Sequence, residues 1–112
     1  MTDTTKKTIQ VTDDTFSSSI EDAEGLAIVD FWAAWCGPCR IVGPIVDQLA
    51  VDYADKGVTV GKLDVDQNPR VTSRFGVRSI PSILFFKDGK LVETVVGAVP
   101  RAQLEKKIEQ HI

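Results

Sequence analysis

Two cysteines, Cys36 and Cys39, stand in the segment Trp35-Cys36-Gly37-Pro38-Cys39. A close pair of thiols can exchange with a disulfide or bind a metal. Proline suits the first turn of a helix, so Pro38 puts Cys36 at or next to a helix N-cap, where free backbone N–H groups favour a thiolate. We therefore expect Cys36 to have a lowered pKa and to be the nucleophile. Cys39 would lie on the same helical face, close enough for a reversible disulfide.

Two other interpretations of this pair are a zinc site and two inert core thiols. Structural zinc takes four protein ligands, and the chain has only two Cys and one His, which is His111 near the C-terminal end. We therefore predict no metal. A single buried Cys is often inert, but a pair beside Gly37-Pro38 at a helix start is typical of redox chemistry.

Asp30 is the one charged residue in an otherwise apolar run of nine, residues 26–34. Because alternate residues of a strand share a face, Asp30 shares its face with apolar neighbours, namely Leu26, Ile28 and Trp32. We expect this carboxyl to be buried and its pKa to be raised by desolvation.

The position of Asp30, six residues before Cys36, lets it lie beneath the thiols. There it could act as a general base that deprotonates Cys39, directly or through water. The alternative is a structural ion pair with Lys62, which a second strand would supply.

The elements that must position these residues alternate between strands and helices. Strands are expected at residues 8–12, 26–34, 58–65, 83–86 and 91–96. Helices are expected after Asp13-Asp14, from Pro38 to just before Gly57, from Pro69 to Gly76 and from Pro100 to Ile112. The order β-α-β-α-β-α-β-β-α predicts an α/β fold with a mixed sheet and helices on both faces.

Two details of the helices are also predicted. Asp13-Asp14 could cap the first helix, in which Phe16 and Ile20 share a face. In the long helix an apolar series recurs every fourth residue and defines the buried face, namely Ile41, Ile45, Leu49 and Tyr53, with Val42 and Val46 beside it.

Length and charge limit the classes of protein further. A chain of 112 residues predicts one domain, residues 1–112, with residues 1–7 as a flexible N-terminal tail. Thirteen basic and sixteen acidic residues give a net charge of −3 with no basic run, so we expect no nucleic-acid partner. The apolar stretches are shorter than the roughly 20 residues that span a bilayer, and no apolar segment follows the first lysines. We therefore expect no membrane partner and a cytoplasmic location.

Three segments of the chain resemble the thioredoxin family, and the resemblance covers nearly the whole sequence. Residues 30–40 (DFWAAWCGPCR) are similar to its active-site segment, residues 79–82 (SIPS) to the loop that faces it, and residues 96–98 (VGA) to its substrate groove. The resemblance implies a thioredoxin fold, a five-stranded mixed sheet flanked by four helices. It also implies that Cys36 and Cys39 form a redox-active disulfide.

The resemblance assigns further roles around this disulfide. It implies a cis Ile80–Pro81 bond and a substrate groove around an exposed Cys36 thiol, formed by Trp35, Ile80, Pro81 and Gly97. It further implies that the redox potential is tuned by Gly37, Pro38 and Lys62. From the residues alone, Pro81 could simply begin a strand. Trp35 is the better candidate for exposure, and Trp32 for the core.

The implied activity is that of a general, monomeric protein-disulfide reductase with no bound cofactor. Electrons would come from NADPH through thioredoxin reductase, a separate FAD enzyme. Expected substrates are oxidised proteins such as ribonucleotide reductase, peroxiredoxins and methionine sulfoxide reductases. Two alternatives stay open: a disulfide oxidase or isomerase, and a binding module or subunit of a larger complex in which the thiols are dispensable.

Overall fold

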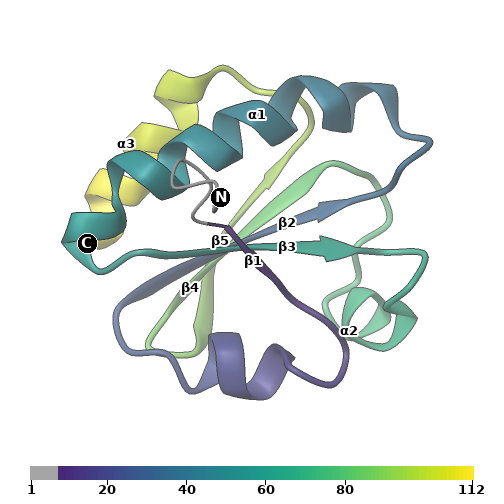
Figure 1. The fold of residues 1–112 in the computed structure, drawn as a ribbon, viewed down its shortest axis with the longest axis horizontal. Helices are drawn as coiled ribbons and strands as arrows, with labels where there is room; N and C mark the ends of the chain where they lie inside the picture. Colours follow the sequence, from purple (N-terminus) through teal and green to yellow (C-terminus); the bar gives the residue numbers. More distant parts are fainter. Residues whose placement is uncertain (1–7) are drawn as a thin grey trace, which may run out of the picture.

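The computed structural model describes residues 8–112 as a five-stranded sheet between two layers of helices (Figure 1). The strands are β1 (Ile9–Gln10), β2 (Leu26–Trp32), β3 (Thr59–Asp64), β4 (Ser82–Lys87) and β5 (Lys90–Val96). Their order in the sheet is β1-β3-β2-β4-β5. The first three are parallel and β4 and β5 are antiparallel to their neighbours, as a mixed sheet requires. The predicted flexible tail, residues 1–7, lies outside the described residues.

The helices are η1 (Ser17–Glu21), a short π-helical turn, and three α-helices: α1 (Gly37–Asp52), α2 (Pro69–Arg74) and α3 (Arg101–His111). A 3₁₀ turn, η2 (Ala54–Lys56), follows α1. Figure 1 shows α1 and α3 over one face of the sheet and η1 and α2 over the other. The predicted α/β fold, with a mixed sheet and four helices, is confirmed. None of the helices over residues 8–112 has the length and apolar character needed to span a bilayer.

Strand β2 lies at the centre of the sheet and leads to the cysteines. It pairs in parallel with β3 and antiparallel with β4, so Asp30 lies opposite Lys62 on one side and Ile83 on the other. All of its residues except Trp32 are buried, as expected for a strand covered on both faces. The strand is two residues shorter than predicted, because a turn follows it in which the N–H of Cys36 donates to a backbone carbonyl three residues earlier.

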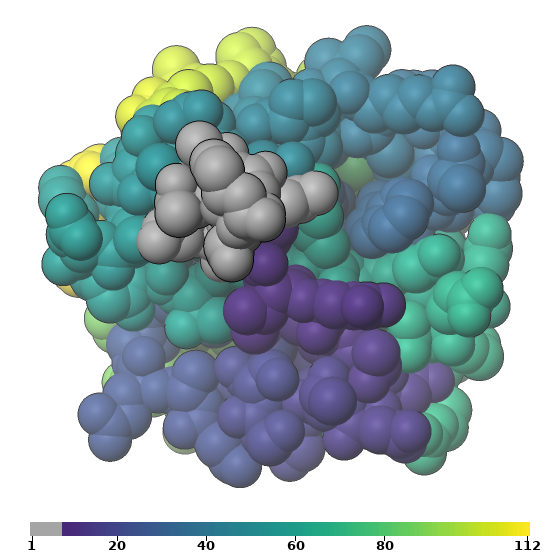
Figure 2. Space-filling view, viewed as in Figure 1, coloured from purple at the N-terminus to yellow at the C-terminus, as the bar shows by residue number. Residues whose placement is uncertain are grey.

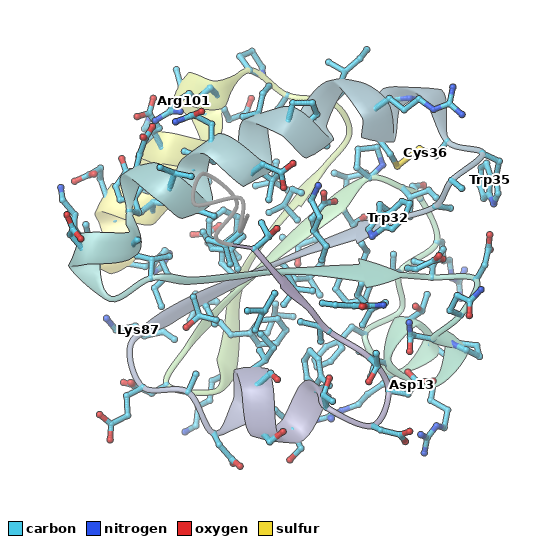
Figure 3. The ribbon with its side chains drawn as sticks, viewed as in Figure 1. Asp13, Trp32, Trp35, Cys36, Lys87 and Arg101 are labelled. Atoms are coloured by element: carbon cyan, nitrogen blue, oxygen red, sulfur yellow. A yellow bond between two sulfur atoms is a disulfide. The ribbon has the colours of Figure 1, made fainter. Side chains whose placement is uncertain are left out.

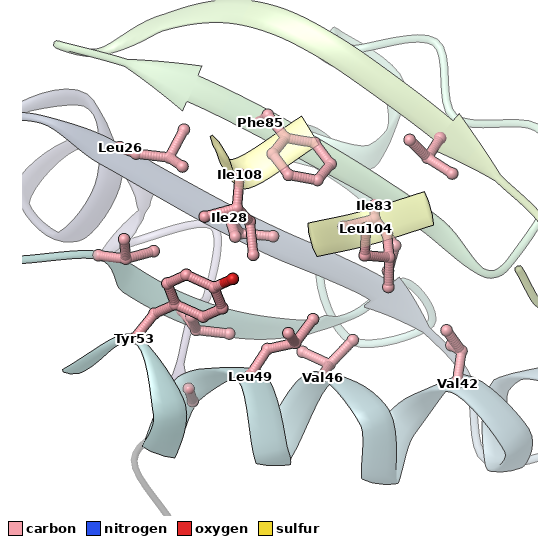
Figure 4. Close-up of a cluster of buried hydrophobic side chains, with 14 residues drawn as sticks. Leu26, Ile28, Val42, Val46, Leu49, Tyr53, Ile83, Phe85, Leu104 and Ile108 are labelled. Atoms are coloured by element: carbon pink, nitrogen blue, oxygen red, sulfur yellow. The ribbon is translucent and has the colours of Figure 1, made fainter. Parts of the chain in front are cut away.

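The buried face of α1 differs from the predicted one. Val42 and Val46 are 0 and 1% exposed, whereas Ile41 is 64% exposed. Figure 4 shows Val42, Val46, Leu49 and Tyr53 pointing from α1 toward the sheet. The prediction that Ile41 begins the buried series is therefore wrong. A helix buries a stripe about 100° wide, and Val42 shares that stripe with Val46, Leu49 and Tyr53.

The carboxylate expected to cap the first helix caps α2 instead. Phe16 and Ile20 of the first helical turn are buried as predicted, but that turn has no side-chain cap. Asp13 accepts hydrogen bonds from the backbone N–H groups of Arg70 (3.1 Å) and Val71 (2.8 Å) at the start of α2. The predicted role of Asp13-Asp14 is therefore wrong, because the fold brings this loop against a helix more than 50 residues away.

Strand β1 is shorter than the predicted residues 8–12, and the chain beyond it continues over the sheet. Val11 is fully buried and its N–H donates to the carbonyl of Lys62 at 2.8 Å. Gly61 permits this close approach, because a Cβ atom at that position would meet the Val11 side chain. Figure 2 shows the segment of β1, in purple, lying across this face of the molecule, with residues of η1 below it.

The orientation of α1 can be tested with two neighbouring residues. We expect Val42→Ala to lower the free energy of unfolding by about 2 kcal/mol, because it leaves a cavity at a fully buried site. Ile41→Ala should change it by less than about 0.5 kcal/mol, since that side chain is exposed. Both substitutions replace a β-branched residue by alanine, so helix propensity cancels. Urea denaturation measures both, and equal losses would contradict the orientation of α1.

Candidate active site

The cysteine pair lies at the N-terminal end of α1 and forms a disulfide. Cys36 is the N-cap residue, and its sulfur accepts a hydrogen bond from the backbone N–H of Cys39 at 3.2 Å. The Cα atoms of the pair are 5.3 Å apart, within the usual range for a disulfide. Pro38 occupies the first turn, as the sequence predicted. The helix start therefore directs free backbone N–H groups toward the sulfur of Cys36, which favours its thiolate form.

The surroundings of the disulfide are mostly apolar. Cys36 and Cys39 are only 3 and 5% exposed, so the expectation of an exposed Cys36 thiol is wrong for this disulfide form. Trp35 is 68% exposed, and its indole N–H donates to a carboxylate oxygen of Asp66 at 2.9 Å. Figure 3 shows Trp35 at the rim of the molecule beside Cys36. Trp32, predicted to be core, is half-buried and packs against the cysteines.

A second loop faces the disulfide, as the resemblance implied. The bond between Ile80 and Pro81 is cis. The carbonyl oxygen of Ile80 lies 3.7 Å from Cys36 Sγ, a close contact and not a hydrogen bond, because a disulfide sulfur carries no proton. Pro81 is buried, and its carbonyl accepts a hydrogen bond from the N–H of Gly97 at 2.8 Å. Gly97 has a φ of +97°, which favours glycine.

Asp30 is buried without a hydrogen-bond partner within the described residues. Its side chain is on the face of β2 that packs against α1, and the residue is 1% exposed, as predicted. Neither carboxylate oxygen has a hydrogen-bond partner within the described part of the chain. Burial raises the pKa of Asp30 to about 7, opposed by the positive charge of Lys62 and assisted by the negative charge of Asp47. Asp30 therefore changes its charge near neutral pH.

A pocket connects Asp30 with Cys39. Its volume is about 460 Å³, and its walls come from the end of β2, from the first half of α1 and from Lys62 of β3. Asp30 and Cys39 both line it, so water that enters the pocket can reach both side chains.

Lys62 does not form the ion pair that was considered for it. Its ammonium group lies 2.9 Å from Oδ1 of Asp47 in α1, and no salt bridge joins it to Asp30 among residues 8–112. Asp47 and Asp66 are site residues that the sequence analysis missed. The sequence contained a signal for Asp47. It follows Cys39 and Gly43 at a spacing of four residues, so the three share one helix face.

The arrangement offers little to a metal ion. Among residues 8–112, no group of three or more His, Cys, Asp and Glu side chains is close enough to hold one. His111 lies on α3, with its ring nitrogen 3.1 Å from a carboxylate oxygen of Glu93 in β5. The reactive groups of the site are the sulfur atoms of Cys36 and Cys39 and the carboxyl of Asp30.

Comparisons with known proteins agree with this geometry. The family profile described as Thioredoxin matches residues 7–110. A thioredoxin of Chlorobaculum thiosulfatiphilum is 46% identical over 106 residues, which cover 95% of this chain and 97% of that protein. Thioredoxin 1 of Synechococcus elongatus is 49% identical over 102 residues, covering 91 and 94%. A chloroplastic M-type thioredoxin of Chlamydomonas reinhardtii is 48% identical, with 91% of this chain and 72% of that protein covered.

A disulfide at a helix start, held by an α/β/α layered fold, defines a thiol–disulfide oxidoreductase. Within that class, the chain belongs to the thioredoxin family. This confirms the resemblance to the thioredoxin family and the protein-disulfide reductase activity that it implied. Members of the family are reduced by thioredoxin reductase and act on disulfide substrates through their redox-active disulfide.

The raised pKa of Asp30 predicts a pH-dependent stability. The unfolded carboxyl ionises near 3.8 and the folded one near 7, so between these values only the unfolded chain loses the proton. The free energy of unfolding should therefore fall as the pH rises from about 4 to 7, by up to about 4 kcal/mol, and then level off. Asp30→Asn should remove this decline, so its stability advantage over wild type grows across that range.

Urea denaturation at a series of pH values measures this difference. Asp14→Asn is the matched control, because the Asp14 side chain is 90% exposed and should leave the decline intact. An identical pH dependence in Asp30→Asn and wild type would contradict a neutral, buried Asp30.

Proposed function

We propose that this protein-disulfide reductase acts generally on oxidised proteins, and that Cys36 attacks, Cys39 resolves and Asp30 accepts the proton of Cys39. The observation that carries this proposal is the unpaired Asp30 carboxyl, which shares one pocket with Cys39. A buried acid without a partner destabilises the fold, so its presence at a pocket that Cys39 also lines supports a chemical role.

The first step is attack by the Cys36 thiolate on a sulfur of the substrate disulfide. A bond forms between Cys36 Sγ and that sulfur, the substrate S–S bond breaks, and the other substrate sulfur leaves as a thiolate that takes a proton from water. Support comes from the N-cap position of Cys36, where the backbone N–H of Cys39 already donates to its sulfur. We assign the tuning of this reactivity to Gly37 and Pro38, which are exposed beside the sulfur, and to Lys62.

The second step releases the substrate. Cys39 gives its proton to the carboxylate of Asp30, and the resulting thiolate attacks Cys36 Sγ. The Cys36–Cys39 bond forms, the mixed disulfide breaks, and the second substrate sulfur leaves as a thiolate. In total two electrons pass from the cysteine pair to the substrate disulfide. The raised pKa of Asp30, about 7, supports this role, because a base that titrates near the working pH combines availability with strength.

Substrates would bind in an extended form across the rim of the disulfide. The proposed groove consists of Trp35, the backbone of Ile80, Pro81 and Gly97. The Ile80 carbonyl lies beside Cys36, and the bond from Gly97 to the Pro81 carbonyl fixes the far side. Pro81 is buried and so shapes the loop more than it contacts a substrate. A groove that recognises the backbone of the substrate more than its side chains would give broad specificity.

The electron source, partners and location complete the proposal. NADPH, through the FAD enzyme thioredoxin reductase, returns two electrons to the Cys36–Cys39 disulfide. The proposed substrates are oxidised proteins of the kind of ribonucleotide reductase, peroxiredoxin and methionine sulfoxide reductase. We further propose that the protein acts as a monomer in the cytoplasm, whose reducing conditions suit a reductase.

An NADPH-coupled assay with thioredoxin reductase and insulin as the disulfide substrate tests the order of the two cysteines. Wild type should consume NADPH, and Cys36→Ser should reduce the rate to the level without protein, because the attacking thiolate is gone. Cys39→Ser should stop after the first step and accumulate a mixed disulfide that is visible on a non-reducing gel. These two variants are matched, because each removes one sulfur of the same pair.

Four results would count against the proposal. Folded wild type that consumes no NADPH, or a Cys36→Ser variant that remains active, would refute the mechanism. A reduction potential close to those of secretory-pathway oxidants would assign the chain to disulfide donation instead. A partner complex that keeps its function when both cysteines are serine would support a binding module.

A further inference from the structure

The charges around Asp30 are arranged in an unexpected way. Asp30 and Lys62 are register partners on adjacent parallel strands, so their side chains share the sheet face that α1 covers. A lysine at that position could pair directly with the carboxylate. Its ammonium group instead bonds to Asp47 Oδ1 at 2.9 Å, and both oxygens of Asp30 are left without a partner within residues 8–112.

Asp47 is well placed to hold the lysine. It follows Cys39 and Gly43 at four-residue spacing on α1, so the three share one helix face, and all three line the pocket with Asp30. The hydroxyl of Thr8, just before β1, donates to Asp47 Oδ1 at 3.4 Å and helps to fix the carboxylate. The ammonium group lies close to Gly43, where a Cβ atom would be 3.5 Å from Lys62 Nζ, an ordinary van der Waals contact.

We propose that Asp47 is a positioning residue, which holds Lys62 against α1 and so keeps the Asp30 carboxyl unpaired and free to accept the proton of Cys39. This inference rests on the proposed role of Asp30 as the base. Without Asp47, the ammonium group would turn to Asp30, its register partner on the same sheet face. Asp30 would then be ionised at lower pH and would be a weaker base.

The electrostatic contributions agree with this arrangement. Burial is the main cause of the raised pKa of Asp30; Lys62 opposes it and Asp47 adds to it. The other charged group that lines the pocket is Arg40 of α1, whose guanidinium donates to the carbonyl of Ala34 at 3.0 Å. On the β4 side Asp30 faces Ile83, which carries no charge. Lys62 and Asp47 are therefore the charged groups whose positions most affect the pKa of Asp30.

The test is a carbon-13 NMR titration of the Asp30 carboxyl in the oxidised protein, with Asp30→Asn used to assign the signal. In Asp47→Asn, an isosteric change, the midpoint should fall by about one pH unit, because Lys62 gains access to Asp30. Asp52→Asn is the matched control. It removes the same charge from the same helix, but Asp52 pairs with Arg101 of α3 at 2.6 Å and lies outside the pocket, so the midpoint should stay unchanged.

A second pair of variants shows whether Asp47 acts through the lysine. Lys62→Met should raise the midpoint, and in that background Asp47→Asn should lower it by clearly less than in wild type, because only the direct effect of the Asp47 charge remains. An unchanged midpoint in Asp47→Asn would overturn the proposal. An equal fall with and without Lys62 would also overturn it, because Asp47 would then act only by its own charge.

The titration separates this inference from the proposed function, because it reads protonation and not turnover. If Asp30→Asn reduced disulfides at the wild-type rate, the base role would fail while the midpoints still tested the arrangement of charges. If the base role holds, the pH dependence of mixed-disulfide resolution in Asp47→Asn should move to lower pH together with the midpoint, with a reduced plateau rate. A plateau that falls with no movement along the pH axis would indicate a merely structural effect and contradict the proposal.

Discussion

The burial of the Asp30 carboxyl without a hydrogen-bond partner is the constraint on which the rest of the site depends. A central strand, covered on both faces, removes the carboxyl from water and raises its pKa to about 7. The same strand leads directly into the turn before Cys36, so the acid and the sulfurs are positioned by one continuous segment of chain. The fold thus accepts a destabilising group at the place where, in the proposed mechanism, a proton moves near neutral pH.

The two cysteines differ in their surroundings. Cys36 caps α1 and lies beside the Ile80 carbonyl, so it meets the substrate side of the site. Cys39 lies one turn into the helix and lines the pocket that reaches Asp30. Both are nearly buried in the disulfide, and the proposed approach of a substrate is along the rim formed by Trp35 and its neighbours. In the proposed mechanism, this difference in surroundings is the reason why Cys36 attacks and Cys39 needs a base.

The strand and helix order, the disulfide pair and the burial of Asp30 could be predicted because each depends on neighbouring residues in the chain. The features that sequence reasoning missed depend on contacts between distant segments. Ile41 fits the apolar spacing of α1 as well as its neighbour does, and only the packing of the helix on the sheet turns it outward. Asp13 carries a capping signal, but the fold decides which helix receives it. The ammonium group of Lys62 could pair with Asp30 on the sheet or with Asp47 on α1. It pairs with Asp47 because α1 packs over the sheet beside Lys62.

The central claim, that Asp30 accepts the proton of Cys39, is tested most directly by single-turnover reduction of a labelled peptide disulfide across pH 5 to 9. The second peptide thiol is released from the mixed disulfide at a rate that does not depend on peptide concentration. This rate therefore reports the resolving step. In wild type its rate should rise as the pH passes through the titration of Asp30, and in Asp30→Asn it should be lower by about a hundredfold near pH 7. Equal rates in the two proteins throughout this range would contradict the account.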